Sequence, residues 1–306
     1  MLIDPGEFDR NPVLVTGGPP SSSLGGGRHS RAPKGRRAVA VSAASTVALL
    51  AALAAAFFFA PGSAQVRQTF FNLPDAKVAF FGNPSHGIFS EGAALLVNIE
   101  LFLVAEVLIL ILAMVIAVIR QLQGAVVFPL RMLAIAYTDF FRGVPLILVI
   151  YAIGFGVPAL SLAGVSTQPT IVYGLVALVL SYSAYVSEVY RAGIESVHPS
   201  QVAAARSLGL SQWQSMRSVV IPQAVRRVVP PLLNDFISLQ KDTALVAVLG
   251  VIEANRAAGI VSSTDFNYTG YTVAAVLFLA LTVPLARFTD FLIARDRRRR
   301  QAGSAR

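Results

Sequence analysis

The sequence predicts an all-α polytopic membrane protein with about six transmembrane helices. Of its 306 residues, 55% are hydrophobic and only 13% are charged, whereas soluble domains carry roughly 25% charged residues. Apolar runs long enough to cross a bilayer core of about 30 Å recur along the chain. Lys and Arg residues gather between alternate runs, which is the distribution that orients membrane helices.

The first apolar run, 38–60, contains no charged residue and predicts an N-terminal transmembrane helix. A cleaved signal peptide is the alternative, because the small residues Gly62, Ser63 and Ala64 follow the run. The apolar core of a signal peptide spans about 7–15 residues, and this run is longer and begins late in the chain. We therefore expect this helix to be retained.

The middle of the chain predicts three further spans. Residues 95–119 form the second. The segment 143–187 has no charged residue and is too long for one helix. Turn residues at 161–170 divide it into two helices, about 143–160 and 169–190.

The last two spans differ in clarity. Residues 271–294 predict a strongly apolar final helix. The uncharged part of the fifth span, 243–252, is too short by itself. It must therefore include the more polar residues 234–242 that precede it.

The distribution of basic residues places both termini in the cytoplasm of a cell whose cytoplasmic membrane the chain crosses. Lys and Arg are abundant before the first span, after the last span and in two loops on the same side. The alternate loops hold only Arg67, Lys77 and Arg256. The net charge of +9 is thus explained by the orientation of the helices in the membrane. The sequence contains no recognisable nucleic-acid-binding module.

The first 37 residues are rich in Gly, Pro and Ser and predict a disordered cytoplasmic tail. No G-x-x-x-x-G-K-[ST] motif occurs in the chain, so we expect that it binds no ATP and no other cofactor. Cysteine is absent, and neither a paired His/Glu metal motif nor a serine nucleophile motif occurs. The sequence therefore indicates neither an enzyme nor a metal site.

A polar stretch between the fourth and fifth spans, VAAARSLGLSQWQSMRSVVIP (202–222), predicts two short cytoplasmic helices that meet at a glycine. Ser200 is expected to cap the first helix, and Gly209 to close it in a left-handed conformation. Ser211 and Gln214 have the spacing of a capping box for the second helix.

The second of these helices is expected to present Trp213, Met216 and Val220 on one face. Pro222 is expected to end it, because proline lacks the amide that a continuing helix needs. Periodicity alone is explained equally well by an ordinary amphipathic helix in the headgroup layer.

The same stretch resembles the cytoplasmic EAA loop of binding-protein-dependent ABC importers, whose pattern is E-A-A, three residues, G, nine residues, I-x-L-P. The triplet 203–205 takes the first place, Gly209 follows at the right distance, and VVIP at 219–222 completes the pattern. In that family the short helix of the loop docks in a groove of the ATPase subunit. The resemblance implies an ATPase-coupling loop made of Ala203, Ala204, Ala205, Arg206, Gly209, Trp213 and Pro222.

Three flanking segments resemble the polar amino-acid branch of this family. AYTDFFRGVPLILV (136–149) is similar to A-Y-x-E-x-F-R-G-T-P-L-L, and AYVSEVYRAGIESV (184–197) to A-Y-x-x-E-x-x-R-x-G-I. NDFISLQKDTALVAVLGVIE (234–253) is similar to N-x-F-I-S-L-x-K-D-T-S-L. The likeness covers about residues 92–295 and implies a five-helix permease core. The expected organisation is a cytoplasmic tail (1–37), an additional helix (38–60), an extracytoplasmic loop (61–91), the permease domain (92–295) and a basic cytoplasmic tail (296–306).

Three positions depart from the family pattern. Ala203 replaces the Glu of E-A-A, Val144 replaces the Thr of R-G-T-P, and Asp139 replaces a Glu. With Ser200 as the cap, position 203 is the third helical residue, from which Glu would return a hydrogen bond to the cap. Its absence is expected to weaken the helix start by roughly 0.5–1 kcal/mol and to remove an acidic contact with the ATPase.

Polar residues in the spans are candidates for a substrate pathway, since a charge at the centre of a span costs roughly 2.5–3.5 kcal/mol and so faces protein or water. Asn234, Ser238 and Lys241 share a helical face, here called the polar stripe, which suits a water-filled pathway or a helix interface. Either Lys241 or Asp242 could meet the zwitterionic head of an amino acid, or the two could hold helices together.

Other charges have two interpretations as well. Glu188 and Arg191 are three residues apart and are expected to pair, either locking helices together or lining the pathway. Arg142 precedes a break between an interfacial helix and the third span, because Pro145 disfavours helix at the residue before it. Glu106 is expected to face a neighbouring subunit.

The resemblance implies the permease subunit of an ATP-driven importer for polar amino acids. Its partners would be ABC ATPase subunits that carry the ATP, an extracytoplasmic solute-binding protein, and a second copy or paralogue, all within membrane lipid. The alternatives are the permease of a related importer for another small solute, such as an osmolyte or methionine, and an ion-coupled secondary transporter.

Overall fold

The computed structural model describes residues 36–304 except residue 123, and this part of the chain is almost entirely helical. Within it there is no strand, only an isolated bridge between Asn83 and Ile88. The chain divides into two compact units, Met1–Ala56 and Phe57–Arg306. Most of the tail predicted to be disordered, 1–37, lies outside the described residues.

Among the described residues, four helices are long and apolar enough to cross a membrane, and the number rises to as many as six when each of two bent helix pairs is counted as one span. This confirms the predicted polytopic α-helical class and its number of spans. The unbroken spans are Val39–Phe59 within α1 (Arg36–Phe59), α4 (Glu91–Gln121), α8 (Thr170–Glu195), and Thr269–Arg295 within α13 (Thr269–Ser304).

The first bent pair joins α5 (Phe128–Gly143) to the segment Leu146–Ala159, at 107°. That segment contains α6 (Leu146–Tyr151), the π-helical η2 (Ala152–Gly156) and α7 (Val157–Ala159). Val144 is extended, with φ −95° and ψ 129°, because the ring of Pro145 excludes helix before it. The predicted break at this position is confirmed.

The second bent pair makes the fifth span a broken one, with a bend of 48°. The π-helical η3 (Met216–Val220) and α11 (Ile221–Asp242) continue into the tighter 3₁₀ helix η4 (Thr243–Leu249), and α12 (Ala254–Asp265) follows. The sequence predicts the uncharged run 243–252 as part of the fifth span, continuing from the more polar residues 234–242. This run forms the 3₁₀ segment and the break, because Gly250, at φ +87°, ends the tight turn.

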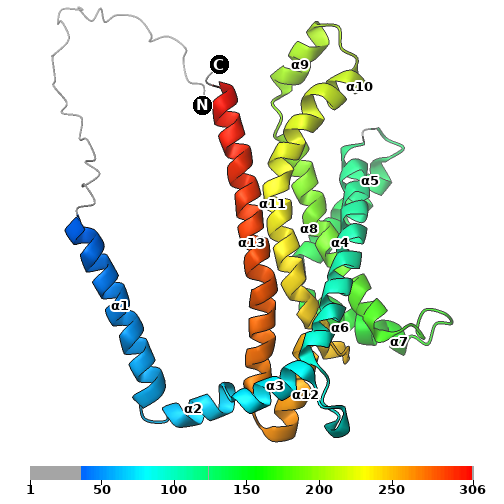
Figure 1. The fold of residues 1–306 in the computed structure, drawn as a ribbon. Helices are drawn as coiled ribbons and strands as arrows, with labels where there is room; N and C mark the ends of the chain where they lie inside the picture. Colours follow the sequence, from blue (N-terminus) through cyan, green and yellow to red (C-terminus); the bar gives the residue numbers. More distant parts are fainter. Residues whose placement is uncertain (1–35, 123, 305–306) are drawn as a thin grey trace, which may run out of the picture. The chain divides into compact units, whose positions relative to one another are not determined.

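Three helices, α4, α8 and α11, form the core of the second unit. They lie alongside one another in Figure 1, and α13 packs on α11. Fully buried alanines on α4, at positions 105 and 113, bring the backbones of α4 and α8 close together. The rings of Phe102 and Phe236 meet edge to face at 4.5 Å and join α4 to α11.

The segment 61–91, expected as a loop, is largely helical. It contains α2 (Ser63–Phe70), α3 (Leu73–Phe81) and the short η1 (Pro84–His86). Figure 1 shows α2 and α3 running across one end of the bundle, while α9 (Pro199–Ser207) and α10 (Gln212–Ser215) lie at the other end.

Candidate functional site

The stretch that resembles a coupling loop forms α9 and α10, which project beyond the ends of α8 and α11 (Figure 1). The predicted cap of α9 is wrong. His198 is the N-cap, and its Nδ1 accepts a hydrogen bond from the backbone N–H of Ser200 at 3.2 Å. Pro199 follows at the first helical position, where its fixed φ is favourable.

Because α9 begins two residues earlier than predicted, Ala203 occupies a different position in the helix. With His198 as the N-cap, the third helical residue is Gln201, and Ala203 falls in the second turn. A glutamate there could not return a hydrogen bond to the cap, so the predicted loss of helix stability does not apply. Ala203 and Ala204 are exposed, whereas Ala205 is buried.

Gly209 closes α9 as predicted, with φ +84°. The N–H of Leu210 donates to the carbonyl of Ala205 at 3.2 Å, and the N–H of Gly209 donates to that of Arg206 at 3.0 Å. These are the two bonds of a Schellman motif. A Cβ at position 209 would meet no atom within 4 Å, so the backbone conformation alone requires glycine.

The predicted capping box of α10 is confirmed. The N–H of Gln214 donates to Ser211 Oγ at 3.2 Å, and Gln214 Oε1 accepts from the N–H of Ser211 at 2.8 Å. The turn at Gly209 is therefore fixed on both sides by hydrogen bonds, which makes α9 and α10 a preformed helix–turn–helix unit.

The residues predicted to share one face of the second helix do not. Trp213 is 69% exposed, whereas Val220 is 4% exposed. The cause is the π-helical segment, in which Ile221 bonds to the carbonyl of Met216, five residues back. Pro222 does not end the helix either; it lies in the first turn of α11, where the wider π segment accommodates its ring.

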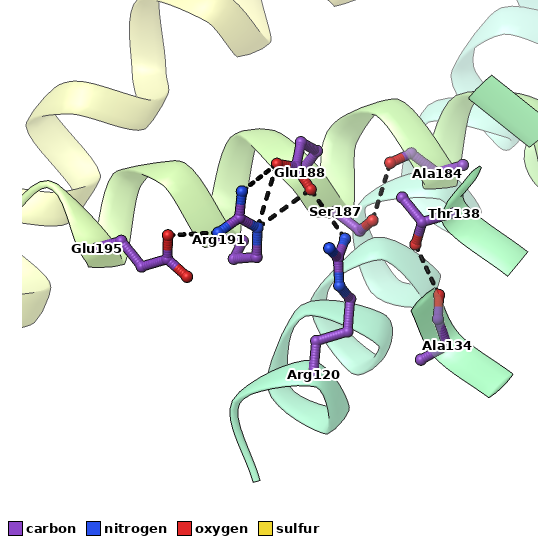
Figure 2. Close-up of polar contacts among 8 residues, drawn as sticks. All are labelled: Arg120, Ala134, Thr138, Ala184, Ser187, Glu188, Arg191 and Glu195. Carbon is purple, nitrogen blue, oxygen red and sulfur yellow. Dashed lines mark hydrogen bonds and ion pairs between the residues drawn. The ribbon is translucent and has the colours of Figure 1, made fainter. Parts of the chain in front are cut away.

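A network of charges joins α4 to α8 at this end of the bundle (Figure 2). Glu188 accepts from Arg120 Nη1 at 2.8 Å and from Arg191 Nε at 3.1 Å, and Arg191 also pairs with Glu195. The predicted Glu188–Arg191 pair is confirmed. Arg120 was missed, because its contact crosses 68 residues of sequence and no local spacing indicates it.

Replacing Glu188 with alanine is expected to lower the free energy of unfolding by about 1–3 kcal/mol, because Arg120 and Arg191 both lose a charged acceptor while mostly buried. Thermal unfolding of the purified protein in detergent checks this. Arg120→Ala should destabilise as well, and the double variant with Glu188→Ala should lose less than the sum of the two, since both remove the same contact. Additive losses would contradict a pairwise contact.

A cavity of about 360 Å³, here called the charged cavity, lies beside this network between the end of α5, α8 and α11. Its wall contains two arginines and two carboxylates. Tyr185, also in the wall, donates from its hydroxyl to the carbonyl of Arg142 at 3.2 Å. The four charged residues are Arg142, Glu188, Arg227 and Asp235.

The polar stripe lies on a face of α11 that the described part of the chain leaves largely uncovered. Asn234 and Lys241 are exposed, and Ser238 is partly exposed. Asp242 points elsewhere and accepts a hydrogen bond from the hydroxyl of Tyr182 at 2.6 Å, so it ties α11 to α8. The role of the stripe stays a prediction.

Glu106 lines a cavity of about 340 Å³ together with residues of α11 and α13, and its contact with a neighbouring subunit stays a prediction. The rest of the cavity wall is mostly apolar and includes Leu110, Phe236 and Leu285.

Sequence reasoning missed a buried polar cluster at the break of the fifth span. Asn98 Nδ2 donates to Glu253 Oε2 at 2.8 Å and to Thr243 Oγ1 at 3.2 Å. The carboxylate of Glu253 also accepts from the N–H groups of Asn255 (3.0 Å) and Arg256 (2.8 Å) at the start of α12. An acidic residue directly before a helix is the signal that could have indicated this cap.

Residues 124–298, more than half of the chain, match the family described as "Binding-protein-dependent transport system inner membrane component". The matched region contains α9, α10, the polar stripe and the charged cavity.

Two curated relatives illustrate the similarity. A probable glutamine ABC transporter permease protein of Bacillus subtilis, GlnM, is 36% identical over 165 residues, which cover 54% of this chain and 74% of the relative. A putative glutamine transport system permease protein of Rickettsia prowazekii, GlnP, is 33% identical over 199 residues, covering 65% and 88%.

Solved structures agree with the fold. A chain from the crystal structure of an amino acid ABC transporter with histidines has a TM-score of 0.61 and 30% identity, and the match covers 66% of this chain and 92% of that one. A chain of the inward-facing MetNI methionine ABC transporter shares the fold, with a TM-score of 0.55 at 15% identity, covering 70% and 98%. The chain therefore belongs to the family of inner-membrane components of binding-protein-dependent transport systems.

Proposed function

We propose that the chain is the permease subunit of an ABC importer that moves polar amino acids across the cytoplasmic membrane. The observation that carries the proposal is the preformed α9–α10 unit at one end of a helical bundle whose sequence belongs to an importer family. Relatives named for glutamine and amino-acid transport support the substrate class.

The α9–α10 unit suits a docking contact with an ATPase subunit. It projects from the bundle, and its turn is flanked by the exposed apolar side chains of Leu208 and Trp213. Apolar side chains on an otherwise polar, projecting element favour burial in a partner. ATP would be hydrolysed on that partner, since this chain carries no phosphate-binding loop.

The placement of elements at the two ends of the bundle supports the proposed topology, with both termini in the cytoplasm. The α9–α10 unit and α2–α3 lie at opposite ends (Figure 1). The segment with α9 and α10 carries Arg206 and Arg217, while Arg67, Lys77 and Arg256 lie toward the other end. On this topology the solute-binding protein docks on the side of α2–α3.

The pathway for the solute is proposed to follow α11, which carries the polar stripe and one wall of the charged cavity. A free amino acid carries an ammonium and a carboxylate group, and the cavity offers groups of both signs within about 360 Å³. A second copy or paralogue of the chain would cover the uncovered face of α11 and complete the pathway.

The proposal is tested by co-purifying the chain with its ATPase and binding protein and reconstituting them in liposomes. Glutamine, glutamate or histidine should stimulate ATP hydrolysis and be taken up, whereas methionine or an osmolyte should do neither. Uptake that survives ATP depletion and stops when an ionophore removes the ion gradient would instead establish a secondary transporter.

Replacing Lys241 with glutamine is expected to reduce uptake about tenfold at limiting substrate, because one charged contact in the pathway contributes about 1.4 kcal/mol. Lys241 is exposed, so the thermal stability of the assembly should change little. Arg256→Gln, which removes an exposed cation from α12, is the matched control and should keep its uptake. Unchanged uptake in Lys241→Gln would remove this residue from the pathway.

A further inference from the structure

The helices α2 and α3 carry an unusual number of exposed apolar side chains for a connection between two spans. Leu73 is 75% exposed and Phe81 is 73% exposed, Phe70 and Phe80 are exposed as well, and so is Phe71 in the connection between the two helices. Contiguous apolar surface of this kind rarely faces water in a folded protein. These helices precede the region that matches the permease family, so that family's pattern does not explain them.

The orientation of α2 and α3 indicates what they contact. They run across the end of the bundle in Figure 1, crosswise to α13, so they lie along the membrane plane if α13 crosses it. The rings of Phe70, Tyr268 and Tyr271 stack in series, with centroids 5.6 Å and 6.2 Å apart. Such aromatic residues are enriched where the acyl region meets the headgroups.

Hydrogen bonds fix α2 and α3 to the turn between α12 and α13. The N–H of Tyr268 donates to the carbonyl of Thr69 at 2.8 Å, and the N–H of Asn72 donates to Thr269 Oγ1 at 3.2 Å. The amide of Asn267 donates to the carboxylate of Asp75. These hydrogen bonds hold the apolar side chains of α2 and α3 against the bundle. The groove beside them is therefore expected to be stable.

A groove of about 430 Å³ lies between α3 and the first turns of α13. Its lining is almost entirely apolar and includes Phe80, Phe81, Val273 and Val276. The one charged side chain in the lining is Lys77, which is exposed. Among the described residues, no carboxylate forms an ion pair with Lys77.

We propose that this α3–α13 groove holds one phospholipid, with an acyl chain along the apolar lining and the headgroup phosphate at Lys77. The apolar floor matches a hydrocarbon chain, because a chain that moves from the bilayer into the groove keeps apolar surroundings and gains packing contacts. The ammonium group of Lys77, which has no ion-pair partner among the residues that the structure describes, matches a phosphate. A protein partner would need polar groups around the apolar centre, and the lining offers little beyond Thr269, Thr272 and Lys77.

The test uses the full chain in lipid nanodiscs that contain phosphatidylglycerol with a diazirine on one acyl chain. Photolysis and peptide mapping should place the strongest label on the segment that contains Val273 and Val276. Lys77→Ala should reduce this label about fivefold, the factor equivalent to about 1 kcal/mol for one lysine at a charged headgroup. Lys77→Arg should retain it.

Two variants fill the groove without depending on the lysine. Ala76→Trp and Val276→Trp should each abolish the label. Because Val276 is exposed on the helix surface, its replacement should not prevent folding. Val107→Trp, on an exposed face of α4 away from the groove, should leave the label unchanged.

Any of three results would overturn the proposal. The first is equal labelling of all bilayer-facing helices, which would mean ordinary surrounding lipid only. The second is loss of label at the groove when the solute-binding protein is added while Lys77→Ala has no effect, which would identify a protein-docking surface. Diazirine-labelled phosphatidylcholine should label the groove too, since it carries the same phosphate; its failure to do so would contradict a contact through the phosphate.

Discussion

On the proposed function, valine at position 209 is expected to abolish at least about nine-tenths of uptake while the protein still reaches the membrane and the proposed ATPase partner still hydrolyses ATP. The cause is conformational, because Gly209 has φ +84° and a side chain there would meet no atom. The left-handed region costs an L residue roughly 1–2 kcal/mol, and a β-branched residue more. That cost lowers the ratio of closed to open conformations of the turn by a factor of about 5–30 or more.

The chain offers a matched control for this substitution. Gly164, in the connection before α8, has φ +73° and equally open surroundings, so Gly164→Val introduces similar strain away from the α9–α10 unit. Uptake and ATP hydrolysis, measured in proteoliposomes, should stay coupled in Gly164→Val. Gly209→Asn should lie between the wild type and Gly209→Val, because Asn tolerates this conformation. Equal transport by the two valine variants would contradict a coupling role for the Gly209 turn.

The sequence predicted those features that depend on local chemistry. The Gly209 turn, the capping box at Ser211 and the break at Pro145 each follow from the conformational limits of one or two residues, and all three are present. The spans were predictable because a bilayer imposes a length and an apolar composition on each helix.

The errors occurred where competing local signals or distant contacts decide the structure. Ser200 is a good capping residue, but Pro199 beside it is better suited to the first helical position, which moves the cap to His198. The π segment before Pro222 changed which residues share a face, and a regular helical period does not reveal such a segment. The partner of Glu188 on α4, Arg120, is 68 residues away.

The break in the fifth span combines both kinds of difficulty. An uncharged run of ten residues, 243–252, reads as part of a helix, yet it forms a 3₁₀ turn and a bend. What holds the bend is Glu253, whose partner Asn98 lies 155 residues earlier on α4. This cluster holds the start of α12 against α4. It therefore helps to keep the broken fifth span, which carries the polar stripe, in its bent shape.

Replacing Glu253 with alanine is accordingly expected to lower the free energy of unfolding by about 3–5 kcal/mol. The side chain is fully buried, and its loss leaves the N–H groups of Asn255 and Arg256 without acceptors and the amide of Asn98 with Thr243 Oγ1 alone. Each unsatisfied buried donor costs about 1–3 kcal/mol. Against a total stability of about 5–15 kcal/mol, this predicts much less folded protein in the membrane.

The measurement is thermal unfolding of the purified protein, with Glu195→Ala as the matched control. Glu195 is 56% exposed and also pairs with a cation, Arg191, so its removal should cost less than about 1 kcal/mol.

Asn98→Ala should destabilise as well, and the double variant with Glu253→Ala should lose less than the sum of the two, since both remove the same contact. If Glu253→Ala were as stable as Glu195→Ala, or if the double variant were additive, the cluster would not hold the bend. Glu253→Gln keeps one acceptor oxygen and should fall between the wild type and Glu253→Ala, which separates the loss of hydrogen bonds from the loss of packing.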